Sequence, residues 1–322
     1  MHDTSTAVLL SDPGPQHESG AANVGLLLAK IQAMQAELDT LREQVDSRRR
    51  NLDEVERELK LASSLQRDFL PKRLPNHARV KFNRLYRPAG HVSGDLYDIR
   101  RLDEQHVGVY VADAIGHGMP VGLLAMFMHY ALQTKRITGH GSYQLLPSHE
   151  AIRLLNEALC ECLANTAFAT ALYARVNVET GHVDLARGGH PLPMLITADG
   201  VIEEVGGQGA LLGLLPEEQF EPISLTLEAG DRLILFTDGV EQLFRESGAP
   251  ADIDHWRKAM HDRAHLTADQ LIADLWRHLE EVGCPKDDVT IVTLEVPESL
   301  VDPTTPPSWA RERRQRRQGA PS

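Results

Sequence analysis

The chain has 322 residues, 42% hydrophobic and 25% charged, which is typical of a globular protein with one large or two small domains. A formal net charge of −13 argues against a general nucleic-acid-binding protein, although acidic residues can also hold divalent cations. Three cysteines are too few for a disulfide framework and no apolar run approaches the roughly 20 residues that span a bilayer, so we expect a cytoplasmic protein with reduced thiols and no membrane segment.

The N-terminal part carries a heptad pattern. Residues 1–21 are polar and rich in Pro, Gly and Ser, so we expect a disordered lead there. Over 22–70, one seam is Val24, Ile31, Leu38, Val45, Leu52, Leu59 and Gln66, and the other is Leu27, Met34, Leu41, Arg48, Val55, Ala62 and Phe69. The heptads predict a parallel coiled coil that makes a homodimer; the alternative is a helix that packs this stripe on its own domain. Arg48 and Gln66 are the two imperfect layers.

Residues 71–298 have the texture of one domain of short strands and helices. In chain order we expect strands at 81–86, 95–102 and 106–113, helices at 120 to about 135 and at 148–163 (capped by Ser148), strands around the turns 179–181, 199–200 and 228–231, helices within 252–282, and a last strand over 287–296. Strands in succession with helices in blocks indicate an α+β domain of antiparallel sheets covered by helices. The Pro-rich, then basic tail, 299–322, is expected to be disordered.

Acidic residues recur where predicted strands meet solvent, each beside a glycine or a second acid. They are Asp95 and Asp98 in SGDLYD, Asp113 in VADAIGHG, Asp238 in LILFTDG, and Asp287 and Asp288 in KDDVT. Taken singly, each Asp is more often a turn residue or helix cap than a ligand. Gathered at one sheet edge, they would repel one another unless cations neutralised them, and hard oxygen ligands without His or Cys favour Mg or Mn over Zn.

Two glycines predict a phosphate site beside these acids. Gly116 and Gly118 let the backbone approach an anion closely, and their N–H groups open the following helix, where the helix dipole favours phosphate. A metal-bound water beside a phosphate site suggests phosphoester hydrolysis.

The order of the motifs carries a family resemblance. The stretches G-D-x-Y-D at Asp95, D-x-x-G-H-G at Asp113, GGHPLP, LLGLL, GDRLILFTDGV and DDVT resemble the metal-dependent serine/threonine phosphatases of the PPM (type 2C) superfamily, in particular its bacterial SpoIIE/RsbU-like branch. The stretch ASSLQRDFLP is similar to the helix that introduces that branch's catalytic domain. The resemblance covers about residues 60–297 and implies an αββα sandwich of two packed antiparallel sheets with two Mn²⁺ or Mg²⁺ ions at one edge.

The same resemblance implies roles for individual residues. Asp113 matches the bridging ligand, Ala114 a backbone-carbonyl ligand, Asp95 the acid at one metal, and Asp238 and Asp287 the pair at the other, with Asp288 left open as an alternative to Asp287. In this family a metal-bridging water attacks the phosphorus of phosphoserine or phosphothreonine directly.

Three further positions depart from the pattern or have more than one interpretation. The eukaryotic relatives carry a histidine two residues after the bridging acid, where this chain has Ile115. His117 comes two residues later, and both catalytic proton transfer and a helix-start or phosphate contact are open for it. His190 in GGHPLP is interpreted as structural. Thr-Glu-Ala commonly follows Gly-Val in the branch, but Glu241 follows it here, which bears on regulation more than on metal binding.

These observations favour a dimeric phosphatase acting on a phosphoserine regulator. By resemblance the substrate is an anti-anti-sigma (STAS-domain) protein, with the coiled coil setting activity and an upstream activator that grips the N-terminal helix as a candidate source of the signal. One alternative is a catalytically silent scaffold that binds a phosphoprotein or anti-sigma partner, against which the intact acids argue. Another is a two-metal hydrolase of nucleotides or small phosphates, which no nucleotide-binding fingerprint supports.

Overall fold

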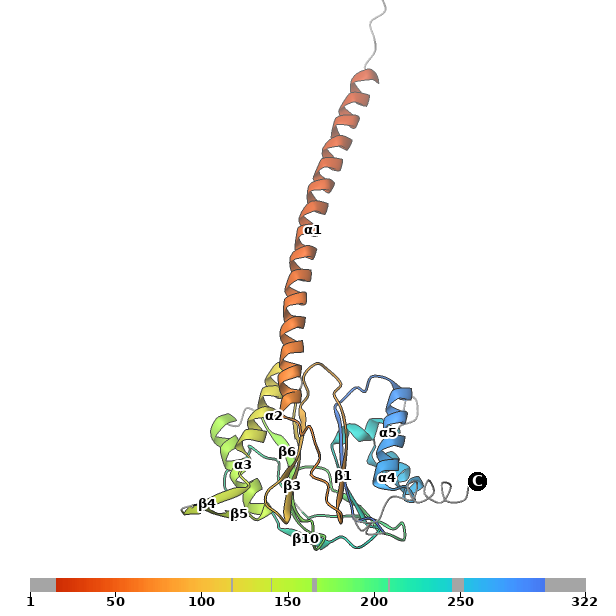
Figure 1. Cartoon of the computed structure of the whole chain (residues 1–322). Coiled ribbons are helices and arrows are strands. Elements are labelled where there is room, and N and C mark those ends of the chain that lie inside the picture. The colour runs from red at the N-terminus through yellow and green to blue at the C-terminus, as the bar shows by residue number, and fades with distance from the viewer. Residues whose placement is uncertain are drawn as a thin grey trace, which may run out of the picture. The chain divides into compact units, whose positions relative to one another are not determined.

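Figure 1 shows the computed structural model of the chain, which describes residues 16–116, 118–139, 141–163, 167–207, 209–244 and 252–298. The chain divides into two compact units, the first ending at Glu58 and the second beginning at Leu59. No helix in these described ranges is both long enough and apolar enough to cross a membrane. The tail expected to be disordered lies outside the described residues.

The N-terminal helix is a single element, α1 (Gln16–Phe69), of 54 residues. It begins within the stretch expected to be disordered, because adding residues to an established helix costs little once its nucleus has formed. The apolar seam residues from Leu27 to Val55 are exposed in the single chain, for example Met34 at 64% and Leu52 at 69%. A second helix covering this seam stays a prediction.

The second unit contains two five-stranded sheets whose neighbouring strands are all antiparallel. In the first sheet the order is β1 (Lys81–Arg87), β12 (Val289–Glu295), β11 (Arg232–Phe236), β8 (Met194–Ile196) and β9 (Ile202–Glu204). In the second it is β10 (Ile223–Thr226), β7 (His182–Gly188), β6 (Ala169–Asn177), β3 (His106–Ala114) and β2 (Asp95–Arg101). Alternate apolar residues of both sheets, such as Val109, Leu172 and Val292, form one buried cluster between them, which confirms the predicted α+β sandwich.

Helices cover the outer faces of both sheets (Figure 1). Helices α2 (Met119–Ala131) and α3 (Ser148–Leu163) pack on the second sheet, with Met128 and Leu155 in one core cluster with Tyr110. Helices α4 (Ile253–Asp262) and α5 (Ala268–Val282) pack on the first sheet, with Trp256 and Leu275 in the third cluster. The sequence pattern located all four helices because each has an apolar face.

Two local predictions were wrong, and one predicted pair of strands is divided between the two sheets. Helix α2 ends at Ala131, and the chain then forms a hairpin of β4 (Lys135–Gly139) and β5 (Ser142–Leu145), which is exposed along most of its length and so gives no alternating apolar signal. Strands β10 and β11 flank one turn but belong to different sheets, so residues 227–231 cross the sandwich. The Ser148 hydroxyl does not cap its own helix, because it donates to the carbonyl of Asp184 at 2.6 Å.

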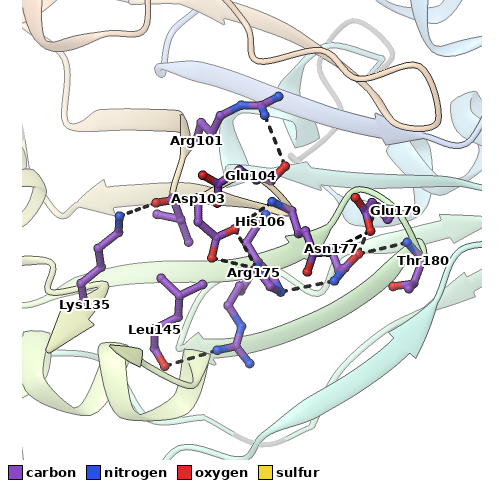
Figure 2. Close-up of polar contacts among 12 residues, drawn as sticks. Arg101, Asp103, Glu104, His106, Lys135, Leu145, Arg175, Asn177, Glu179 and Thr180 are labelled. Carbon is purple, nitrogen blue, oxygen red and sulfur yellow. Dashed lines mark hydrogen bonds and ion pairs between the residues drawn. The ribbon is translucent and has the colours of Figure 1, made fainter. Parts of the chain in front are cut away.

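The end of the second sheet where β3 begins is closed by polar contacts, shown in Figure 2. The Asp103 carboxylate accepts from the backbone N–H of His106 at 2.7 Å, and Asn177 Oδ1 accepts from the N–H groups of Glu179 and Thr180, both at 3.0 Å. The Lys135 ammonium donates to the carbonyl of Leu102. These bonds join turns and strand ends, so this end has a structural role. Asp113, a predicted metal ligand, lies at the other end of β3.

Candidate metal centre

Both sheets bring their acidic strand ends to the same edge of the sandwich. Asp95 opens β2 and lies opposite Asp113, near the end of β3, in the antiparallel register of the second sheet. Asp238 follows β11 and opens the short 3₁₀ helix η1 (Asp238–Gln242), and Asp287 comes just before β12. Strands β11 and β12 are neighbours in the first sheet. Antiparallel neighbours begin and end at the same edge, which is why acids far apart in sequence meet here. Asp98 does not join them; its carboxylate pairs with Arg100.

Asp95 is held by two threonines of the opposite sheet. Its side chain is buried, and Oδ2 accepts hydrogen bonds from Thr237 Oγ1 at 2.7 Å and from Thr290 Oγ1 at 2.6 Å. Both threonines are fully buried, and Thr237 Oγ1 also accepts from the backbone N–H of Thr290 at 3.0 Å. Sequence reasoning missed this pair, although the motifs FTDG and DDVT that contain the candidate ligands also contain the threonines.

Burial and neighbouring carboxylates raise the pKa of three of these acids, Asp95, Asp113 and Asp238. Burial raises the pKa of Asp113 to about 7, and the carboxylates of Asp238, Asp287 and Asp288 add to the effect. Burial, followed by the charge of Asp113, also raises the pKa of Asp95 well above its usual value. The pKa of Asp238 is raised by burial and then by Asp287. Keeping several such groups ionised together requires positive charge, and all-oxygen donors suit Mg²⁺ or Mn²⁺.

The two neighbouring aspartates before β12 have different contacts. Asp288 uses both carboxylate oxygens on the loop that crosses from β1 to β2, with Oδ1 accepting from Ala89 N and Oδ2 from Gly94 N, each at 2.7 Å. Asp287 is exposed, and one of its oxygens accepts from the backbone N–H of Asp288 at 2.9 Å. Asp288 therefore holds the loop, and Asp287 has the more exposed carboxylate of the two; which of them binds metal stays a prediction.

Glycines line the space beside the acids. A cavity of about 280 Å³ is bounded by Gly116, Gly118, Lys286 and Asp287 among others. Gly116 and Gly118 have φ of 125° and 83°, a region that disfavours residues with a side chain, and Gly118 caps the N-terminus of α2. His117, between them, lies outside the described residues, so its predicted roles stay untested.

The carbonyl of Ala114, predicted to be a metal ligand, lies against Gly94. A Cβ atom at Gly94 would stand 2.7 Å from this oxygen, so only glycine fits there. The Ala114 N–H donates to the Gly94 carbonyl at 3.1 Å, which continues the pairing of the two strands past Asp95 and Asp113.

The last turns of α1 contact the loop that carries Asp95. The Gln66 side chain is buried, its Nε2 donates to Ser93 O at 2.7 Å, and its Oε1 accepts from Ser93 N at 3.0 Å. Ser93 Oγ in turn accepts from the Asp95 N–H at 3.1 Å. The prediction that Gln66 forms a layer of the coiled-coil seam is therefore wrong for this conformation, because the amide side chain satisfies the backbone of Ser93.

His190 is a structural residue of the core, as predicted. It is fully buried, its Nδ1 lies 2.8 Å from Thr170 Oγ1, and burial lowers its pKa to about 3, so it is neutral at physiological pH. Among the side chains that the structure describes, no three acidic, histidine or cysteine groups are arranged around one point as a metal cluster. The individual ligand roles therefore stay predictions.

Comparison with known proteins places this architecture in a family. Residues 103–297, more than half of the chain, match the family described as Stage II sporulation protein E (SpoIIE). The phosphoserine phosphatase RsbU of Bacillus subtilis (strain 168) is 25% identical over 244 residues, which are 75% of this chain and 70% of RsbU. The phosphoserine phosphatase RsbP of the same organism is 26% identical over 185 residues, 58% of this chain and 45% of RsbP, so the chain spans less than half of that relative.

Solved structures agree on the fold. The SiaA-PP2C domain of Pseudomonas aeruginosa is similar with a TM-score of 0.62 and 20% identity, covering 76% of this chain and 98% of that one. The PP2C phosphatase domain of Bacillus subtilis SpoIIE, with a fragment of its regulatory domain, gives a TM-score of 0.55 and 22% identity over 68% of this chain and 62% of that one. With two antiparallel sheets, acids at one shared edge and a matched family profile, the chain belongs to the SpoIIE family, in the SpoIIE/RsbU-like branch of the PPM phosphatases.

Proposed function

We propose that the chain is a metal-dependent protein phosphatase that removes phosphate from a phosphoserine regulator. Serine/threonine phosphatase activity follows from its place in the SpoIIE family, in which the similar proteins RsbU and RsbP are named phosphoserine phosphatases. The observation that carries the proposal is the meeting of acids from both sheets beside a cavity lined by Gly116 and Gly118.

The donor set fits divalent cations. Asp95, Asp113, Ala114, Asp238 and Asp287 would hold two Mg²⁺ or Mn²⁺ ions, because they offer hard oxygens and three of these carboxylates have raised pKa values that cations would lower. The similar RsbX structure, with a TM-score of 0.50 and 18% identity, is described as a complex with magnesium. When bound, such ions supply a water of lowered pKa for attack on phosphorus and offset the charge that develops on the phosphate.

The chain's own residues prepare the site for this reaction. Thr237 and Thr290 fix the rotamer of Asp95, and Asp288 holds the loop that leads into it. The backbone at Gly116 and Gly118, at the N-terminus of α2, offers N–H groups and the positive end of the helix dipole to the substrate phosphate. The reaction therefore needs no nucleophilic side chain.

We infer that the substrate is a phosphorylated STAS-domain protein and that the protein works as a homodimer. The exposed heptad seam of α1 supports the dimer, and the bonds between Gln66 and Ser93 give α1 a direct contact with the loop that carries Asp95. An upstream activator that binds α1 would change the position of the Asp95 loop through this contact.

The test is phosphate release by the purified full-length chain from a phosphorylated STAS-domain protein encoded near its gene. We expect release that requires added Mn²⁺ or Mg²⁺ and stops on chelation, because hard-oxygen sites hold these ions less tightly than Cys/His cages hold zinc. Full activity after exhaustive metal removal would refute the metal-dependent reaction. Release from p-nitrophenyl phosphate but not from any phosphorylated STAS-domain protein would refute only the substrate.

A further inference from the structure

We propose that the open edge of strand β1 binds an extended acidic segment of a partner protein, which adds to the first sheet as an extra strand. A groove of about 550 Å³ runs along this edge. Its lining combines arginine with aromatic and aliphatic side chains from α1, β1, β2 and α5: Arg67, Leu70, Arg84, Leu85, Tyr86, Arg87, Pro88, Tyr97 and Trp276. The proposal does not depend on the phosphatase reaction.

The lining shows that the groove follows the strand edge. Five consecutive residues, 84–88, border the same cavity. Successive side chains of a strand point to opposite faces of the sheet, so a cavity on one face would touch only alternate residues. Residues of both faces border this groove, with Tyr86 beside Tyr97 of the second sheet and Leu85 in the core cluster under α5. A ligand in it would lie alongside the backbone of β1.

The backbone of this edge has free hydrogen-bonding groups. Among the strands that the structure describes, β1 pairs only with β12. The Phe82 N–H donates to Asn76 Oδ1 at 2.7 Å, so the backbone of Phe82 points away from β12, and the segment before β1 covers this first part of the edge. In an antiparallel strand every second residue points the same way, which places the backbone groups of Arg84 and Tyr86 on the open edge. Within the described ranges neither amide has another partner. Such an edge is a template for an added strand.

Charge favours an acidic partner. Residues 67–87 contain seven Lys or Arg and one acid, in a chain with a formal net charge of −13. In this segment, over the described residues, the only ion pair joins Lys72 to Asp68 at 3.0 Å. The Arg84 guanidinium lies 5.9 Å from the centre of the Tyr97 ring, and none of the groove-lining residues is acidic. Arginines that lack a carboxylate partner beside a free strand edge match carboxylate side chains that alternate along an extended chain.

The apolar lining separates a peptide from other anions. Leu70 and Trp276 offer contacts to the aliphatic side chains that alternate with carboxylates on such a segment. Nucleic acid and anionic lipid would pair with the arginines but would not form strand-type hydrogen bonds with the free backbone groups of Arg84 and Tyr86. The combination of edge, charge and apolar surface therefore selects an extended acidic peptide.

The test uses the full-length protein and a fluorescein-labelled eight-residue peptide of alternating Val and Glu, followed by fluorescence anisotropy. We expect the Arg84→Ala/Arg87→Ala variant to bind at least about tenfold more weakly, because the charge-assisted hydrogen bond from Arg84 to a carboxylate on its own face of the sheet is lost and the positive charge beside the edge falls by two. Arg101→Ala/Arg257→Ala, which removes the same charge elsewhere, should bind like the unaltered protein. A peptide with Lys in place of Glu should not bind.

Two further measurements locate the bound peptide and check the folding of each variant. Amide hydrogen exchange over residues 81–87 should slow when the peptide binds, and p-nitrophenyl phosphate hydrolysis and the thermal midpoint should show that each variant is folded. Arg67→Ala, on the exposed surface of α1, provides a second variant if the double variant is unstable. Absence of binding to the unaltered protein, equal affinity in the Arg84/Arg87 variant, or binding without slowed exchange would overturn the proposal. Tighter binding of a single-stranded oligonucleotide or of phosphatidylserine vesicles than of the Glu peptide would overturn it as well.

Discussion

Replacing either threonine that holds Asp95 by valine should destabilise the metal-free protein, and the two replacements should differ. Thr290→Val removes one hydroxyl that donates to Asp95 Oδ2 at 2.6 Å, at a cost of about 0.5–1.5 kcal/mol, because without metal the raised pKa of Asp95 favours its neutral form. Thr237→Val removes the equivalent bond at 2.7 Å and also leaves the buried N–H of Thr290 without its acceptor, which adds about 1–3 kcal/mol. Valine has nearly the same volume as threonine, so no cavity is created.

The assay is urea unfolding of both variants in excess chelator, combined with Mn²⁺ titration calorimetry at pH 7.5. We expect Thr237→Val to lose about 1.5–4.5 kcal/mol of unfolding free energy and Thr290→Val about a third of that. Both variants should bind Mn²⁺ more weakly, since each hydroxyl lowers the pKa of Asp95 and its loss raises the cost of ionising this acid. A larger loss for Thr290→Val, or unchanged Mn²⁺ affinity in both variants, would refute the reasoning.

Three further predictions concern the acids and the dimer. The folded-state pKa of Asp113, about 7, lies above its unfolded value, so its contribution to stability is present in full below about pH 4 and is lost as pH rises to 7. Urea unfolding in chelator should show this loss as at most about 4 kcal/mol. Below pH 7, Mn²⁺ affinity should increase with rising pH, by up to about tenfold per pH unit, because the ion must displace the proton of Asp113. A flat affinity between pH 5.5 and 7 would contradict this. Asp238→Asn should abolish turnover and leave the thermal midpoint in chelator unchanged or higher, whereas His117→Ala should cost less activity; equal losses at every pH would restore a general-acid role for the histidine. Arg48→Leu should tighten the dimer and change activity or metal affinity. A chain shortened to begin near Leu59 should be monomeric by light scattering and should differ in both activity and metal affinity. Identical rates and metal dependence in the unaltered protein, the Arg48→Leu variant and the shortened chain would show that the coiled coil only tethers the two subunits.

The amino-acid sequence determined the local structure wherever burial imposes a period. The amphipathic pattern over 148–163 predicted α3 with its bounds, and apolar runs predicted β3 and β6 because both faces of these strands are covered. The hairpin of β4 and β5 was missed because it buries little and so has no apolar period. The sequence also identified the acids of the candidate centre, since each stands beside a strand end in a motif that occurs in a characteristic order.

The tertiary structure alone decided which groups serve these acids. Asp95 receives its hydrogen bonds from threonines 142 and 195 residues away, and Asp288 reaches amides 199 and 194 residues away. The same holds for Gln66, whose place in a heptad suggested a dimer seam but whose side chain bonds to Ser93. The spacing of apolar residues along a segment indicates only which of its faces are buried. These contacts depend instead on which strands pair and which sheet each strand joins. Antiparallel pairing across two sheets brings distant residues to one edge, and no local pattern records that pairing.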